Sequence, residues 1–257
     1  MEVHAHSSPA PGGGHTPRKK WTHYFWEFLM LFLAVFCGFL AEYQLEHKIE
    51  KDRARQYVFS FYNDLAGDTA RLFGLLNSEN KKIEALSRMN SCYAILLKDP
   101  TANTCFFELI KNSSANSPGN FNDKTLRQLS NAGGYRTLKR EDADSIMSYE
   151  SMLDGIRGFN STAYQEAQEN LRNTFSSIIE FSANIKLYRN ITFKNWDYND
   201  EVNFPLLFTN DRTLLNKYFN ELFQYLKVTV GHRNRIKALK EKATTLILYF
   251  KQKYHLD

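Results

Sequence analysis

Two cysteines, Cys92 and Cys105, are the residues of this chain whose type and spacing most clearly suggest chemistry. They flank the turn-forming stretch DPTANT (residues 99–104), near the facing ends of two expected helices. In an oxidising compartment the two thiols can form a disulfide, and closing a loop of about 14 residues would stabilise the fold by about 3 kcal/mol in the chain-entropy model. The alternative is a pair of separate buried thiols.

The other residue types that carry out catalysis or bind metals do not form a recognisable pattern. The seven histidines do not cluster, and the Cys-x-x-Cys, His-Glu-x-x-His, Gly-x-Ser-x-Gly and phosphate-loop motifs are missing from the sequence. Glu141 and Asp142 are interpreted as solvated charges that complement the dipole at the start of a helix. We therefore expect no catalytic residues, no cofactor and no metal site, and predict that the protein is not an enzyme.

The longest apolar stretch of the chain, WEFLMLFLAVFCGFLAEY (residues 26–43), predicts a membrane anchor. A helix from Trp21 to Tyr43 would be about 34 Å long, which is enough to cross a hydrocarbon core of about 30 Å. Trp21, Trp26 and Tyr43 stand near its ends, where amphipathic rings prefer the membrane interface. Cleavage after Ala41 is disfavoured because bulky Phe39 would occupy a position that requires a small residue. A buried helix of a globular domain is the alternative to an uncleaved signal anchor.

The charges that flank this helix predict its orientation. A flexible tail rich in Pro, Gly and His, residues 1–20, ends in the basic cluster Arg18, Lys19 and Lys20, whereas mixed charges follow Tyr43. The positive-inside rule then places the tail in the cytoplasm and residues 44–257 on the outer side. Arg18, Lys19 and Lys20, together with the interfacial aromatic residues, are the predicted contacts with membrane lipid.

Small residues on one face of the anchor suggest self-association. Ala34 and Gly38, and then Cys37 and Ala41, are four positions apart, a spacing that allows two membrane helices to approach closely. The alternative is a face that contacts lipid alone.

The remaining sequence predicts an all-α outer domain. Glycine and proline are scarce, at 12 and 6 of 257 residues, and apolar residues recur at helical spacing. We expect a stalk continuous with the anchor and a helical hairpin within 44–98, with possible breaks at Gly67 and Gly74. An irregular segment, 186–210, precedes two final helices at 211–229 and 232–254. The predicted architecture is an antiparallel helical bundle of four or five main helices.

Charge distribution argues against a nucleic-acid partner. The formal net charge is +5, but basic and acidic residues are interleaved, and no basic block occurs after the first twenty residues.

Two features of the sequence resemble a known family. The anchor carries Glu27 before its apolar part and Gly38 and Ala41 late in it, and the motif LRQLSNAGGYRTL (residues 126–138) precedes an acidic amphipathic helix at 140–156. Over roughly residues 21–185 this pattern is similar to that of a Bacteroidota family of single-pass inner-membrane proteins of unknown function. The chain departs from that pattern in having Ala-Gly-Gly where Ser-Gly is more usual. The resemblance implies an inner-membrane anchor and a periplasmic domain, and it carries over no functional residues.

These observations favour a membrane-anchored periplasmic interaction or scaffold protein, whose partner is another envelope protein or a second copy of the chain. The alternative is a ligand-binding sensor domain that signals through a partner protein, because helical bundles can hold small molecules in their cores. A deep apolar pocket would favour the sensor, and a solid core would disfavour it.

Overall fold

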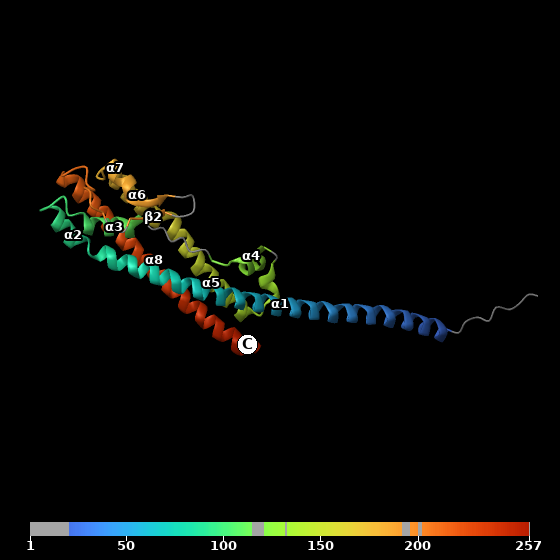
Figure 1. The fold of residues 1–257 in the computed structure, drawn as a ribbon. Helices are drawn as coiled ribbons and strands as arrows, with labels where there is room; N and C mark the ends of the chain where they lie inside the picture. The colour runs from blue at the N-terminus through green and yellow to red at the C-terminus, as the bar shows by residue number, and fades with distance from the viewer. Residues whose placement is uncertain (1–20, 115–120, 132, 192–195, 200–201, 257) are drawn as a thin grey trace, which may run out of the picture. The chain divides into compact units, whose positions relative to one another are not determined.

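The computed structural model describes residues 21–114, 121–131, 133–191, 196–199 and 202–256. The predicted tail, with Arg18, Lys19 and Lys20, lies outside the described residues. The fold is all-α (Figure 1). Its α-helices are α1 (Trp21–Ser87), α2 (Met89–Leu96), α3 (Asn103–Ser114), α4 (Lys124–Asn131), α5 (Arg140–Phe159), α6 (Gln165–Ser176), α7 (Phe181–Lys186) and α8 (Arg212–Tyr254). A 3-10 turn, η1 (Gly134–Thr137), and a π-helical turn, η2 (Asn160–Tyr164), complete the helical elements.

The chain divides into two units, Met1–Asp52 and Arg53–Asp257, and the boundary falls within α1. In the first unit, every residue from Trp21 to Asp52 is exposed except Leu29, which is half-buried. Within the part of the chain that the structure describes, α1 contains one stretch that is long and apolar enough to cross a membrane.

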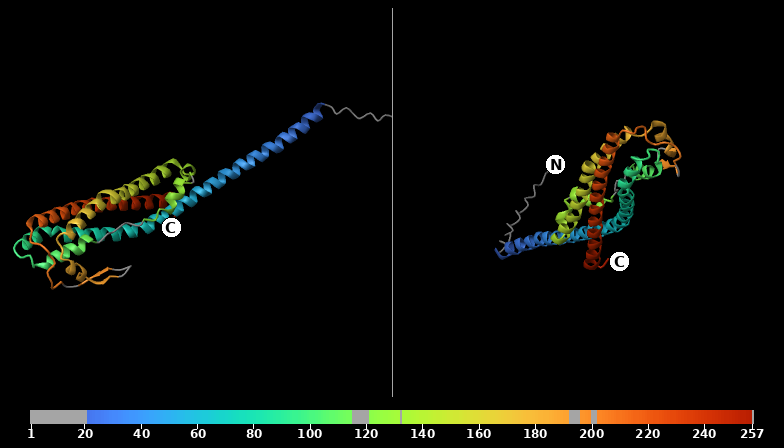
Figure 2. Two further views of the ribbon diagram at one scale, coloured as in Figure 1. Left: turned by 90° about the horizontal axis from the view of Figure 1, so that it is seen from above. Right: turned by 90° about the vertical axis from the view of Figure 1, so that its left-hand side faces the viewer.

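The second unit is built on three long helical segments: α1 from Arg53 onward, the pair α5–α6, and α8. The helical turn η2 joins α5 to α6 without a break in the helical backbone. Phe61 of α1 packs edge-on against Tyr149 of α5 and Phe250 of α8. Further along, Tyr164 of η2 packs against Tyr225 of α8. These contacts make α8 antiparallel to α1 and to α5–α6, and Figure 2 shows α8 alongside α5–α6.

Two predicted helix boundaries are wrong. The hairpin expected within 44–98 does not form, because α1 continues through Gly67 and Gly74 to Ser87, and α2 follows after the single residue Arg88. The two final helices are one helix, α8, whose interior contains Gly231. A glycine inside a helix costs only about 1 kcal/mol, which the buried apolar stripe on either side readily offsets.

Gly231 also has a packing role. A Cβ built on it would lie 3.4 Å from the ring of Phe159 and 3.3 Å from the guanidinium of Arg235. The guanidinium carbon of Arg235 lies 4.0 Å from the centre of the Phe159 ring. Gly231 therefore lies where the end of α5 packs against α8.

The core has two apolar clusters. One joins α2, α3, α6 and the first half of α8, with Leu86, Phe106 and Leu222 among its fully buried residues. The other joins α1, α4, α5 and the second half of α8, with Leu72 and Ile146.

The motif at 126–138 folds as α4 followed by η1, and both of its glycines are required. Gly133 has a φ of +64°, the left-handed conformation that glycine adopts without strain. A Cβ on Gly134 would come within 3.1 Å of the Cα of Leu129. Asp64 of α1 fixes the start of α4, because its Oδ2 accepts a 2.6 Å hydrogen bond from the hydroxyl of Thr125.

The sequence-based interpretation of Asp142 as a solvated charge is wrong, because the residue is buried and ties α5 to the end of α8. Its carboxylate is buried and accepts hydrogen bonds from Lys253 Nζ (2.7 Å), Tyr254 OH (2.6 Å) and Tyr249 OH (2.8 Å). Burial alone would raise the pKa of Asp142, but these three hydrogen bonds outweigh it and hold the pKa below the ordinary value of 3.8.

Segment 186–210 contains two short antiparallel strands, β1 (Tyr188–Ile191) and β2 (Trp196–Tyr198). An isolated bridge between Ile179 and Leu207 ties the end of this segment to the chain just before α7.

Candidate binding groove beside the disulfide

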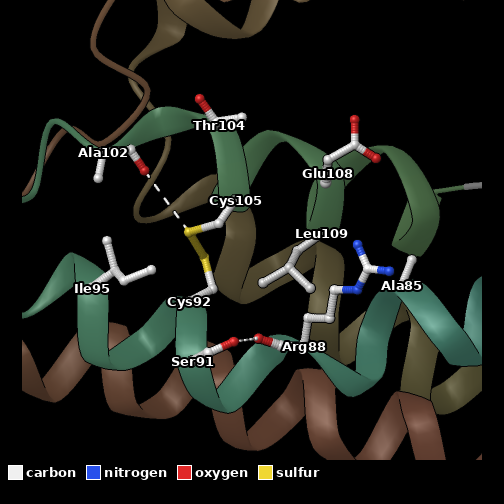
Figure 3. Close-up of a pocket in the computed structure, with 10 residues that line it drawn as sticks. All are labelled: Ala85, Arg88, Ser91, Cys92, Ile95, Ala102, Thr104, Cys105, Glu108 and Leu109. Atoms are coloured by element: carbon white, nitrogen blue, oxygen red, sulfur yellow. Dashed lines mark hydrogen bonds between the residues drawn. A yellow bond between two sulfur atoms is a disulfide. The ribbon is translucent and has the colours of Figure 1, made fainter.

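Cys92 and Cys105 form a disulfide that links α2 to α3 (Figure 3). Their Cα atoms are 5.6 Å apart, within the range of ordinary disulfides. Cys92 is buried, whereas Cys105 is half-buried and faces a groove. The sequence could foresee this pairing because the short turn between the two helices brings their ends together.

Polar side chains shape the connection between α2 and α3. Asp99 Oδ1 accepts hydrogen bonds from the backbone N–H (2.9 Å) and the hydroxyl (2.6 Å) of Thr101, and these bonds lower the pKa of Asp99. Asn103 donates from Nδ2 to the carbonyl of Phe204 (2.7 Å) and accepts from the N–H of Leu206 (3.1 Å). The start of α3 is therefore fixed against the segment that precedes α8.

The groove has a volume of about 430 Å³ and opens to solvent. Its apolar surface comes from Ile95 of α2, Leu109 of α3 and the disulfide. Arg88, next to the end of α1, and Glu108 of α3 place opposite charges on facing walls. Ala85, Ser91, Ala102 and Thr104 complete the lining. Such a surface can hold apolar side chains at its centre and charges of both signs at its margins.

A second groove, of about 400 Å³, lies on the other flank of α2. It is bordered by Tyr93 of α2 and by Phe219 and Phe223 of α8, together with the amides of Asn90, Asn216 and Asn220. The helix α2 therefore has an open groove on each side.

The groove residues do not form a catalytic arrangement of a base beside a nucleophile. Arg88 Nη2 donates to Glu84 Oε1 at 3.2 Å, and Ser91 Oγ donates to the carbonyl of Arg88 at 2.7 Å. Among the described residues, no group of three or more His, Cys, Asp or Glu could hold a metal ion. The disulfide is the one redox-active group in the lining of this groove.

A buried polar layer lies between the two apolar clusters. Glu79 and Lys82 of α1 are 0% and 3% exposed. Lys82 Nζ donates to Glu79 Oε1 at 3.3 Å and to the hydroxyl of Tyr164 at 2.9 Å. The hydroxyls of Tyr164 and Tyr225 are 2.9 Å apart, and His232 Nδ1 lies 3.7 Å from Glu79 Oε1. Three helical segments thus contribute to one charged cluster in the centre of the unit.

Some of the buried polar atoms in this layer lack a hydrogen-bond partner among the described residues. Within the described residues, Glu79 Oε2 and both ring nitrogens of His232 are buried without a hydrogen-bond partner. Burial and the neighbouring hydroxyl of Tyr164 raise the pKa of Tyr225, so that it remains a neutral phenol. The layer is therefore costly to desolvate and sensitive to the loss of any one member.

Sequence reasoning missed this layer, because the final helix expected at 232–254 begins at His232, which is instead buried in the interior of α8. One signal was present: Glu79 and Lys82 continue the inward positions of the apolar stripe that contains Leu72 and Leu86. A charged residue at such a position indicates a buried polar cluster.

The other predicted site residues lie on α1. Ala34, Cys37, Gly38 and Ala41 are all exposed in the first unit, and so are the interfacial aromatic residues Trp21, Trp26 and Tyr43.

Comparison of the chain with protein-family models, with curated proteins and with solved structures gives no match.

Proposed function

We propose that this protein is a membrane-anchored interaction protein of the bacterial envelope. Residues 21–43 of α1 cross the inner membrane with the N-terminus in the cytoplasm, and residues 44–257 lie in the periplasm. The apolar stretch that begins at Trp21 and the basic cluster before it support this placement. The resemblance of the anchor and of the motif at 126–138 to the Bacteroidota family supports the same compartment, and so does the Cys92–Cys105 disulfide, because disulfides persist in oxidising compartments.

The observation that carries the proposal is the open groove beside the disulfide. It presents exposed Ile95 and buried Leu109 between charged walls, and it lacks a catalytic arrangement. The partner that fits it is a protein segment with apolar side chains at its centre and charges of both signs around them. We infer that the domain binds such a segment in the periplasm and catalyses no reaction.

Site-specific photo-crosslinking in intact cells tests the groove. A photoreactive amino acid at Ile95, which is 46% exposed in the groove, is compared with one at Leu248, which is 63% exposed elsewhere. We expect a defined protein adduct from the Ile95 position alone, and its loss when Ala102→Trp fills the groove. Equal adducts from both positions, or none from either, would argue against the groove as a docking site.

The alternative, a ligand-binding sensor, is favoured by one observation: about 430 Å³ falls within the size range of small-molecule pockets. The open form of the groove favours a protein segment instead, because small-molecule sites enclose most of their ligand. A small molecule that raises the melting temperature of the wild type but not of Ala102→Trp would support the sensor.

A further inference from the structure

The outward face of α1 between Phe59 and Ser78 is unusually poor in charge for a solvent-exposed helix. All of these residues belong to the part of the chain that the structure describes. The exposed ones are Phe59, Ser60, Asn63, Ala66, Gly67, Ala70, Arg71, Phe73, Gly74, Asn77 and Ser78. Arg71 is the single charged residue among them, and it pairs with Asp68 of the same helix at 3.4 Å. The exposed face of a helix in a soluble bundle normally carries many charges.

Two large aromatic side chains project from this face. Phe59 is 52% exposed and Phe73 is 56% exposed, although Lys240 of α8 covers part of the Phe73 ring. Between them lie Ala66 and Ala70, and a Cβ added at Gly67 would meet nothing within 4 Å. Exposed aromatic residues and depleted charge are features of the composition of a protein–protein interface.

The spacing of the face points to another helix as its partner. The central positions 59, 63, 66, 70, 73 and 77 are separated by four and three residues in alternation, so that equivalent positions recur every seven residues. This is the repeat of two helices that wind around each other, and asparagines such as Asn63 and Asn77 fix register at such seams. The stretch from Phe59 to Ser78 is about 30 Å long.

We propose that this face, the α1 seam (Phe59, Asn63, Ala66, Ala70, Phe73 and Asn77), is an interface between two copies of this chain in parallel orientation. None of the six seam residues is charged, so that two copies of the seam can face each other without opposing like charges of their own. Followed back along the sequence from Phe59, the seven-residue spacing reaches Asp52 before Leu45 and Gly38, so the uncharged seam begins at Phe59. Lipid is a poorer occupant, because it would leave the amides of Asn63 and Asn77 without hydrogen bonds.

The proposal rests on the proposed function in one respect, namely the shared membrane. Two anchored copies have the same orientation and a high effective concentration, so that a short seam suffices for association. A parallel pair places each seam residue beside its own copy, which is a directly testable geometry.

Disulfide crosslinking of the full chain in native membranes tests the seam. Ala70→Cys is compared with Ala238→Cys, an exposed alanine on α8, both in a Cys37→Ala background that removes the other free thiol. Under a mild oxidant we expect at least five-fold more covalent dimer from Ala70→Cys. Adding Phe73→Glu should abolish most of that dimer, whereas Leu248→Glu, at an equally exposed site, should leave it unchanged.

Equal crosslinking at both positions, absence of the dimer, or an adduct whose mass differs from twice the chain would each overturn the seam. A mass map that finds the Cys92–Cys105 bond intact shows that each variant is folded. Carbonate extraction of the same membranes reports the anchor separately. If the protein stays in the membrane fraction but Ala70→Cys gives no dimer, the seam alone is refuted. If the protein is released from the membrane but Ala70→Cys still gives the dimer, the anchor is refuted and the seam is kept.

Discussion

Replacement of Lys82 by methionine tests the buried polar layer most directly. Lys82 is 3% exposed, and its ammonium group lies 3.3 Å from a carboxylate oxygen of Glu79, which is fully buried. Methionine keeps most of the side-chain volume but removes the charge, which leaves the Glu79 carboxylate in the interior without its cation. Breaking a buried ion pair from one side costs about 3–5 kcal/mol. Since domains are stable by about 5–15 kcal/mol, Lys82→Met should remove a large share of the stability.

The assay is urea unfolding of the full chain in mild detergent, followed by circular dichroism. A matched control is Lys237→Met, because Lys237 and Glu241 form a pair at 3.9 Å with both side chains about two-thirds exposed. Exposed pairs contribute about 0–1 kcal/mol, so this control should unfold close to the wild type. A Lys82→Met variant that unfolds within about 1 kcal/mol of the wild type would contradict the assignment of a buried, mutually dependent pair.

The double variant Glu79→Leu with Lys82→Met sharpens the test. Removing both charges removes the uncompensated carboxylate, and replacement of buried pairs by apolar residues is often neutral or stabilising. We therefore expect the double variant to be more stable than Lys82→Met alone, with a coupling energy of about 1–3 kcal/mol. Strict additivity of the two single changes would refute the reasoning, because it would mean that the two groups do not interact.

Three further changes have defined outcomes. Replacing Cys92 and Cys105 by serine should lower the free energy of unfolding by about 3 kcal/mol, and a non-reducing peptide map of the wild type should recover the linked peptides. Asp142→Asn should destabilise the domain at neutral pH. Because the pKa of Asp142 is depressed in the folded state, the stability that this carboxylate contributes is fully present above the unfolded value near 3.8 and is lost as the pH falls through the lower folded pKa. In an acid titration, Asp142→Asn should therefore lose less stability than the wild type over that pH range. Gly134→Ala should lower the free energy of unfolding by about 1–3 kcal/mol, since the added Cβ meets Leu129 at 3.0 Å. Gly155→Ala, whose Cβ meets nothing within 4 Å, should instead raise it by up to about 1 kcal/mol, and thermal unfolding of both variants measures the difference.

The helices could be predicted from the sequence because their signal is local. The apolar residues Val58, Phe61, Leu65 and Leu72 recur at helical spacing, and the structure buries all four. The errors arose where a local rule competes with distant packing. Glycine at position 231 weakens a helix locally, but α8 continues through it because buried apolar residues on both sides, such as Tyr225 and Ile236, pack in the core.

Of the candidate site, only the disulfide could be predicted from the sequence. Cys92 and Cys105 are only 13 positions apart in the sequence, and the turn between their helices brings them together. The polar layer joins residues far apart along the chain, such as Lys82 and Tyr164, and no local pattern in a single sequence specifies that pairing. The groove itself depends on the depth to which α2 and α3 pack on α8, which is also a tertiary property.

The polar layer has a consequence for the register of the three long segments. Glu79 and Lys82 are nearly one turn apart on α1, and their partners come from η2 and from α8. If α1 slid by one turn, about 5.4 Å, Lys82 would face the apolar cluster that contains Leu86, and its charge would lose every partner. Apolar side chains tolerate such a slip far better than a buried ammonium group does. Because α2 follows α1 after a single residue, the layer that fixes the register of α1 also fixes where α2 and its two grooves lie.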